Sequence, residues 1–261
     1  MTGRDATEMA ISAAGTDPWA VLRDATRARV ALGRAGDGLP TSRELEFRAA
    51  HAAARDAVHT ALDPDRVRTA LTEAGVGLDV LEVLEVHSQA PDRTTYLQRP
   101  DLGRRLDPDT RLPGGPHDLA LVLADGLSPR AVHEHAAGTV AAVLARLPGW
   151  SVAPLVLAHQ ARVALGDPVG EALGAGIVVV LVGERPGLSS ADSLGLYLTH
   201  GPRPGRADSE RNCISNVRPP HGLGYAQAAD TLAGLLRASR QLGASGVVLK
   251  DEGTTLPPGA G

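Results

Sequence analysis

The chain has 261 residues, enough for one large domain or two modest ones, and its hydrophobic fraction of 43% can form a substantial core. Aromatic residues make up only 2%, so leucine, valine and alanine must fill that core. The formal net charge of −4 gives no support to a nucleic-acid-binding surface, which would need clustered positive charge.

The first third of the chain is predicted to be helical. Apolar residues recur there at the spacing that puts them on one face of a helix, and a glycine-rich turn follows the first such pattern. In chain order we predict a small, polar, disordered tail at 1–17. Three helices follow it, at 17–29, 40–61 and 65–74.

The second of these helices has the strongest pattern. Thr41 and Glu44 have the capping-box spacing, in which each side chain satisfies a free backbone N–H of the first turn. We expect its buried positions to include Leu45, Ala49, Ala52 and Ala53.

From residue 81 onward, strands are predicted to alternate with helices. Ser128 and Pro129 are typical of a helix start, and the continuous branched run at 177–182 is typical of a strand covered on both faces. The alternation predicts an α/β fold with a Rossmann-like, mostly parallel sheet flanked by helices. The strands are predicted at 81–86, 117–124, 152–157, 177–182, 194–199 (near an edge) and 246–249, and the helices at 129–147, 167–174 and 225–242.

The patterns divide the chain into four segments. These are a disordered tail at 1–17, a helical domain at 18–80, a Rossmann-like domain at 81–250 and a second disordered tail, rich in glycine, threonine and proline, at 251–261.

Three loops are candidates for a ligand site, because open α/β sheets bind ligands beyond the carboxyl ends of their strands. Gly183 and Gly187 lack side chains that would block a flat ligand, Glu184 can accept hydrogen bonds from amide groups, and Arg185 can donate as a fork. A tight turn with a surface ion pair explains the same residues equally well. The three loops lie at 125–128, 182–187 and 211–216.

The common catalytic motifs are missing from the sequence. It contains no P-loop, no G-x-G-x-x-G that opens a helix and no G-x-S-x-G elbow. Cys213 and the nine histidines have no zinc-site spacing, and His133 and His135 lie two apart on a predicted helix, where they point to different sides. We therefore expect neither a metal site nor catalytic residues on this chain.

The expected compartment is the cytoplasm. The single cysteine rules out an internal disulfide, the longest apolar run is only strand-sized, and the N-terminus lacks a secretion signal.

Six blocks of sequence occur in an order and spacing that resemble the light chain, or small subunit, of ethanolamine ammonia-lyase, over about residues 18 to 250. The most specific combination is YLQRPDLGRRL with LVGERPG and NCISN. The blocks are residues 29–36, 41–49 (TSRELEFRA), 96–105, 125–128 (DGLS), 183–188 (GERPGL) and 213–216 (CISN).

The resemblance implies a partner and a cofactor. The partner is a large subunit with a TIM-type barrel that binds ethanolamine, and residues 18–80 would help to dock it. The cofactor is adenosylcobalamin, whose cobalt–carbon bond breaks to give a radical that takes a hydrogen from the substrate, after which the amine migrates and leaves ammonia and acetaldehyde. The light chain would hold cobalamin against the large subunit.

The same resemblance implies three cofactor contacts on this chain, at Val163, Glu184 and Cys213. Val163 would offer an apolar wall or a backbone group, Glu184 would accept from the corrin amides, and Cys213 would be a small, soft contact. The Asp-x-His-x-x-Gly motif of many cobalamin mutases is absent, which favours a base-on cofactor. The N-terminal extension that directs enteric relatives into a bacterial microcompartment is short here, which argues against encapsulation.

Two other hypotheses remain. A stand-alone nucleotide enzyme would be active by itself but should carry a phosphate-binding glycine signature. A non-catalytic assembly protein of the same complex would bind no cobalamin.

Overall fold

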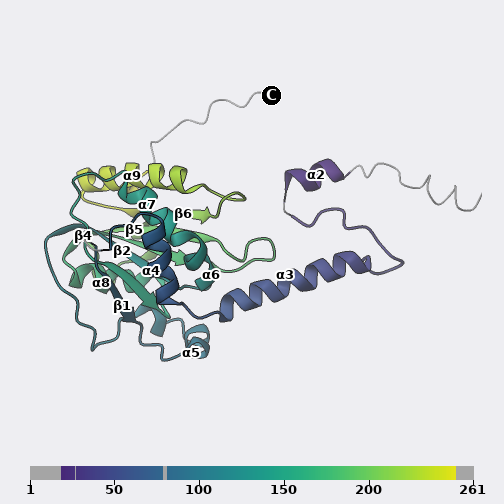
Figure 1. Ribbon diagram of the computed structural model, residues 1–261, viewed down its shortest axis with the longest axis horizontal. Helices are drawn as coiled ribbons and strands as arrows, with labels where there is room; N and C mark the ends of the chain where they lie inside the picture. The colour runs from purple at the N-terminus through teal and green to yellow at the C-terminus, as the bar shows by residue number, and fades with distance from the viewer. Residues whose placement is uncertain (1–18, 27, 79–80, 251–261) are drawn as a thin grey trace, which may run out of the picture. The chain divides into compact units, whose positions relative to one another are not determined.

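Figure 1 shows the computed structural model, which describes residues 19–26, 28–78 and 81–250. These residues form two compact units that divide between Ala52 and Ala53. The two predicted disordered tails, at 1–17 and 251–261, lie outside the described residues. No helix in the described ranges is long and apolar enough to cross a membrane.

The first unit contains α2 (Ala20–Ala25) and the first part of α3 (Thr41–His59). Thr41 is the first helical residue; the amides of Arg43 and Glu44 donate to the carbonyl of Pro40, and the Glu44 carboxylate accepts from Arg48 on the next turn.

The expected burial along α3 is wrong for its first half. Leu45 is 59% exposed and Ala49 is also exposed, whereas the buried position of α3 is Ala57. An apolar helix face is buried only where another element covers it, and the spacing of the residues does not say where that happens.

A six-stranded sheet forms the centre of the second unit, in the order β1-β3-β2-β4-β5-β6. The first four strands in this order are parallel, and β5 and β6 add antiparallel to β4 and β5, so the predicted mostly parallel α/β sheet is confirmed. The strands are β1 (Val83–His87), β2 (His117–Ala124), β3 (Leu155–His159), β4 (Ala175–Gly183), β5 (Leu194–His200) and β6 (Arg211–Val217).

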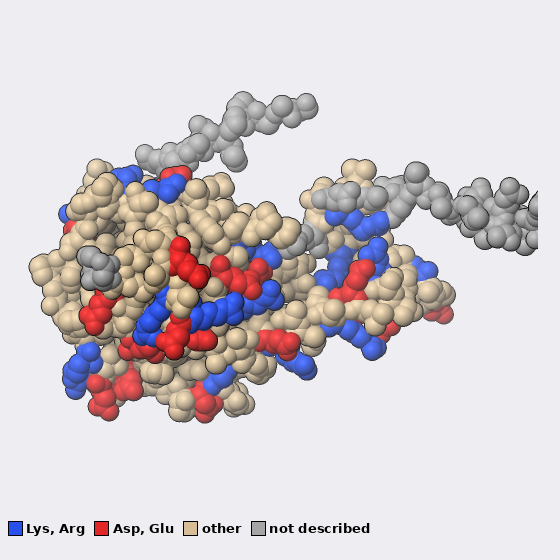
Figure 2. All heavy atoms as spheres, in the orientation of Figure 1, with Lys and Arg blue, Asp and Glu red and all other residues tan. Residues whose placement is uncertain are grey.

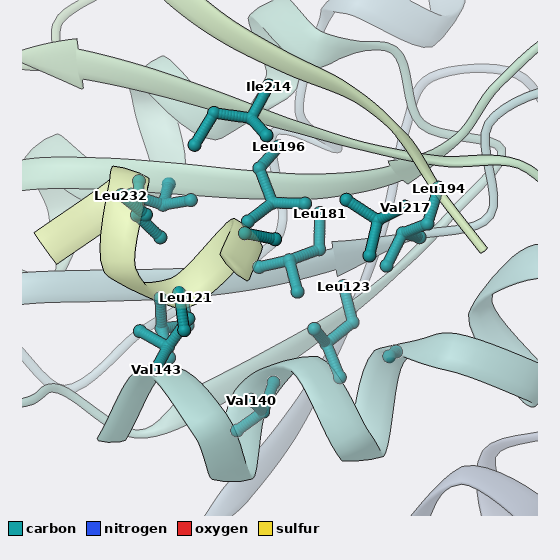
Figure 3. Close-up of a cluster of buried hydrophobic side chains, with 14 of the residues drawn as sticks. Leu121, Leu123, Val140, Val143, Leu181, Leu194, Leu196, Ile214, Val217 and Leu232 are labelled. Carbon is teal, nitrogen blue, oxygen red and sulfur yellow. The ribbon is translucent and has the colours of Figure 1, made fainter. Parts of the chain in front are cut away.

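Helices cover both faces of this sheet. Alternate residues of each strand point to opposite faces, so Leu121 and Leu181 belong to one core cluster and Val122 and Val180 to the other. Figure 3 shows the first cluster, in which Val140, Val143 and Leu232 pack against the strands. The helices of this face are α4 (Pro64–Glu73), α6 (Pro129–Ala131) with α7 (Ala137–Leu144), and α9 (Tyr225–Leu242); α8 (Gly166–Ala172) covers the opposite face.

The predicted helix at 129–147 contains an irregular turn. Ser128 caps it as predicted, since its side chain accepts from the amide of Ala131. Between α6 and α7 lies a π-helical turn, η2 (Val132–Ala136), of a kind often found at functional sites.

Two predicted elements are corrected by the structure. Residues 211–216 were predicted as a loop, but they belong to the edge strand β6, which satisfies its backbone groups by pairing with β5. Residues 246–249 were predicted as a strand, but Gly246–Val248 forms a 3-10 turn, η5. The sequence also gave no sign of α5 (Arg93–Gln98) and η1 (Leu102–Arg104).

Figure 2 shows a run of basic side chains across the visible face of the second unit, with acidic side chains on both sides of it.

Candidate functional site

The candidate site lies at the carboxyl ends of β2, β3 and β4. After β2, the chain runs through α6 and α7 on one face of the sheet to β3, which is one neighbour of β2. It then runs through α8 on the other face to β4, which is the other neighbour of β2. The loops after β2 and β4 therefore meet at a topological switch point, where open α/β sheets commonly bind ligands.

Asp125 ties two of these loops together. Its buried carboxylate accepts from the amides of Gln160 and Ala161, both at 2.9 Å, and lies 3.4 Å from Nη1 of Arg93. Burial raises the pKa of Asp125, while the two amides and Arg93 act in the opposite direction. The carboxylate thus fixes the loop after β3 against the end of β2.

Gly183 and Gly126 let the other pair of loops touch. Gly126 has a φ of +54°, and the amide of Leu127 donates to the carbonyl of Gly183 over 2.9 Å. A Cβ at Gly183 would lie 2.0 Å from the carbonyl oxygen of Ser128. The missing side chain of Gly183 therefore makes room for the neighbouring loop, while Gly183 also lines one of the hollows, so its expected role in ligand approach stays a prediction.

Tyr96 lies between two arginines beside these loops. The Arg162 guanidinium is 4.5 Å and the Arg93 guanidinium 4.9 Å from its ring centre, and its hydroxyl donates to the carbonyl of Ala161 over 3.1 Å. Burial raises the pKa of Tyr96, which keeps the phenol neutral. Gly103 packs against the ring and its carbonyl accepts from the amide of Arg162, so the YLQRPDLGRR block builds this wall.

Glu184 follows β4 and is bonded to the two antiparallel strands. Its carboxylate accepts from the hydroxyls of Ser193 and Ser215 and from the amide of Asn216 at 3.2 Å. The turn that follows is closed by the bridge between Gly187 and Ser190. Glu184 thus belongs to a hydrogen-bonded junction of β4, β5 and β6. The donors in these three hydrogen bonds are two hydroxyls and an amide, which are not the partners expected for a surface ion pair.

Cys213 faces Tyr197 across β5 and β6. Desolvation raises the pKa of the Cys213 thiol, so the sulfur is protonated at neutral pH. A thiolate, not a thiol, is the usual nucleophile and metal ligand, so this environment suits a packing contact.

Two adjoining hollows bring the three predicted residues together. The first, of about 400 Å³, is lined by Val163 and Cys213, and the second, of about 280 Å³, by Val163 and Glu184. Both hollows share Arg162, Val163 and Tyr197. Tyr96, Arg162 and Tyr197 also line these hollows but were not predicted as functional residues. Tyr96 lies in one of the family blocks, whereas no sequence signal marked Arg162 or Tyr197.

The histidines on the π-helical turn have separate partners, as their spacing predicted. His133 Nε2 accepts from the amide of Asp63 over 2.9 Å, whereas His135 Nδ1 lies 2.9 Å from the hydroxyl of Tyr225. Ligand atoms of Glu134, His135 and Asp192 lie within 4.8 Å of one another, but Arg130 pairs with Glu134 and Arg218 with Asp192.

The structure is thus an open α/β sheet with partly apolar hollows lined by carboxylate and guanidinium groups, features that are common in the ligand sites of α/β proteins. Residues 16–250 match the family described as ethanolamine ammonia-lyase light chain (EutC), and the chain belongs to this family. The resemblance inferred from the sequence blocks is thereby confirmed.

Several relatives named ethanolamine ammonia-lyase small subunit match most of the chain. The Ralstonia nicotianae protein is 53% identical over 90% of this chain and 88% of its own length. The Rhodococcus erythropolis protein is 52% identical over 90% of both chains, and the Azotobacter vinelandii protein is 54% identical over 92% of this chain and 91% of its own.

Proposed function

We propose that this chain is the small subunit of an adenosylcobalamin-dependent ethanolamine ammonia-lyase, which converts ethanolamine to acetaldehyde and ammonia in complex with a large subunit. In this proposal the large subunit binds ethanolamine and carries the catalytic groups, and the two hollows hold part of the cofactor in the base-on form. The observation that carries the proposal is that Val163, Glu184 and Cys213 line two adjoining hollows in a chain from this family.

The chemistry of the hollows fits a large amide-bearing cofactor. Three buried polar atoms have no hydrogen-bond partner among the described residues: Arg93 Nη2, Gln160 Oε1 and Arg162 Nε. Of these three residues, Arg162 lines both hollows. A buried donor without a partner is costly, and a ligand that offers an acceptor there would relieve that cost. Corrin side chains are amides, which offer acceptors.

The roles of the chain's own residues follow from their positions. Val163 and Tyr197 supply apolar surface shared by both hollows, while the Glu184 carboxylate is held in place by three donors and can accept from a further amide. Adenosylcobalamin itself supplies the radical chemistry when it is bound. The chain's share is to bind, orient and exclude water.

The proposal is tested by producing this chain together with an ethanolamine ammonia-lyase large subunit. We expect corrin absorbance to travel with the purified complex after cobalamin is added, and ethanolamine to be deaminated by the complex but not by either chain alone. A complex that assembles without retaining corrin absorbance would support the assembly-protein hypothesis instead.

Glu184→Ala sharpens this test. Loss of the acceptor should weaken cobalamin binding by the complex roughly tenfold. Glu171→Ala, an exposed carboxylate on α8, is the matched control and should bind as the wild type does. An unchanged dissociation constant for Glu184→Ala would contradict a role in the cofactor site.

A further inference from the structure

Arg162 lines both hollows, whereas Arg185 lines only the second, and Arg104 and Arg211 line only the first. Arg104 lies 3.4 Å from Asp208, and Arg211 forms two 2.7 Å hydrogen bonds with the buried carboxylate of Asp167. Across residues 19–26, 28–78 and 81–250, no carboxylate is recorded within ion-pairing distance of the Arg162 guanidinium, and its Nε is buried without a partner.

The side chain of Arg162 is held ready for a ligand. Its backbone amide donates to the carbonyl of Gly103 over 2.8 Å, and its guanidinium lies 4.5 Å from the centre of the Tyr96 ring. The stacked geometry leaves the in-plane N–H groups of the fork available, and the residue lines both hollows. A preorganised, half-buried cation of this kind favours an anionic oxygen acceptor over a neutral one.

We infer that Arg162 binds the phosphodiester of cobalamin's nucleotide loop. This inference rests on the proposed function, because it names the part of the cofactor that this residue recognises. The phosphodiester is the negatively charged group of the nucleotide loop, whereas the remaining polar groups on the periphery of the corrin are neutral amides. A guanidinium is the side chain that best matches two phosphate oxygens at once.

The test compares two corrinoids on the purified complex. Cobinamide retains the corrin ring and its amides but lacks the phosphodiester and the base, and both ligands are followed by visible absorbance. We expect Arg162→Gln to raise the dissociation constant of cyanocobalamin roughly 10- to 100-fold and that of dicyanocobinamide less than about twofold. Arg162→Lys keeps the charge without the fork, so its dissociation constant for cyanocobalamin should lie between those of the wild type and Arg162→Gln.

Arg111→Gln is the matched control, because Arg111 is exposed and does not line either hollow. It should leave both dissociation constants unchanged. Circular dichroism and the melting temperature of each variant show whether the fold is kept; if Arg162→Gln does not assemble, the same comparison is made with Arg162→Lys.

Equal losses for the two corrinoids, or no loss for either, would overturn the assignment of Arg162 to the phosphodiester. A wild-type complex that binds neither corrinoid would instead overturn the proposed function itself. The two failures are therefore distinguishable.

Discussion

Gly183 is the most tightly enclosed glycine among the described residues: a Cβ there would lie 2.0 Å from the carbonyl oxygen of Ser128 and 2.8 Å from that of Asp125. Both neighbours are backbone atoms in a loop that Asp125 fixes to the end of β3, so neither can move aside without disturbing the site. The residue is a packing requirement of the strand-end junction.

Gly183→Ala should therefore lower the free energy of unfolding by roughly 2 to 4 kcal/mol. Gly187→Ala is the matched control, because its Cβ would meet Ser190 Oγ at 3.4 Å, an ordinary contact, and should cost less than about 1 kcal/mol. Urea unfolding of the purified complex measures both. Equal stability of the two variants would show that the loop after β2 gives way easily.

At the scale of elements, the π-helical turn η2 between α6 and α7 packs against α4. His133 on this turn accepts a hydrogen bond from the amide of Asp63, which caps α4 with its own side chain. Desolvation, followed by the nearby charge of Arg66, lowers the pKa of His133 below its ordinary value of 6.5. A neutral imidazole is needed at this position, because a protonated Nε2 cannot accept.

The pH dependence follows from the sign of this shift. Above pH 6.5 the histidine is neutral in both the folded and the unfolded chain, so its contribution to stability is fully present. As the pH falls through 6.5 the unfolded chain takes up the proton first, and stability is lost until the lowered folded pKa is reached.

His133→Gln keeps an acceptor but does not titrate. We expect its melting temperature to fall less than that of the wild type between pH 7 and pH 5, and His221→Gln, at an exposed position, to follow the wild type. Parallel curves for His133→Gln and the wild type would show that the acid sensitivity arises elsewhere.

For the whole molecule, we propose that the helical segment at 18–80 docks the large subunit. Large apolar side chains remain exposed in its first part: Leu45 is 59% and Phe47 43% exposed on α3. Exposed apolar side chains of this size are typical of protein contact surfaces, so the large subunit is the expected cover.

Leu45→Glu with Phe47→Glu should weaken co-purification with the large chain tenfold or more, because charges would enter an apolar contact (about 1.4 kcal/mol or more). Leu242→Glu, on a leucine that is 54% exposed at the end of α9, is the control for a surface charge in the second unit. Intact complex formation by the double variant would place the docking surface elsewhere.

The sequence by itself determined the elements with a clear local pattern. β2 and α9 have the bounds that their residues predicted, and Ser128 caps its helix as expected. Hydrophobic period, capping residues and proline position depend on neighbours along the chain, so one sequence is enough to reveal them. The six family blocks similarly identified the family; the three cofactor contacts that the resemblance implied line two adjoining hollows and stay a prediction.

The tertiary structure decided what depends on partners distant in sequence. Residues 211–216 form a strand because β5 pairs with them, Leu45 is exposed because nothing described covers it, and Asp125 gains its role from the amides of Gln160 and Ala161. The solitary charge of Arg162 is likewise visible only once Asp208 and Asp167 are seen to pair with other arginines. Such relations join residues tens of positions apart, and no local periodicity records them.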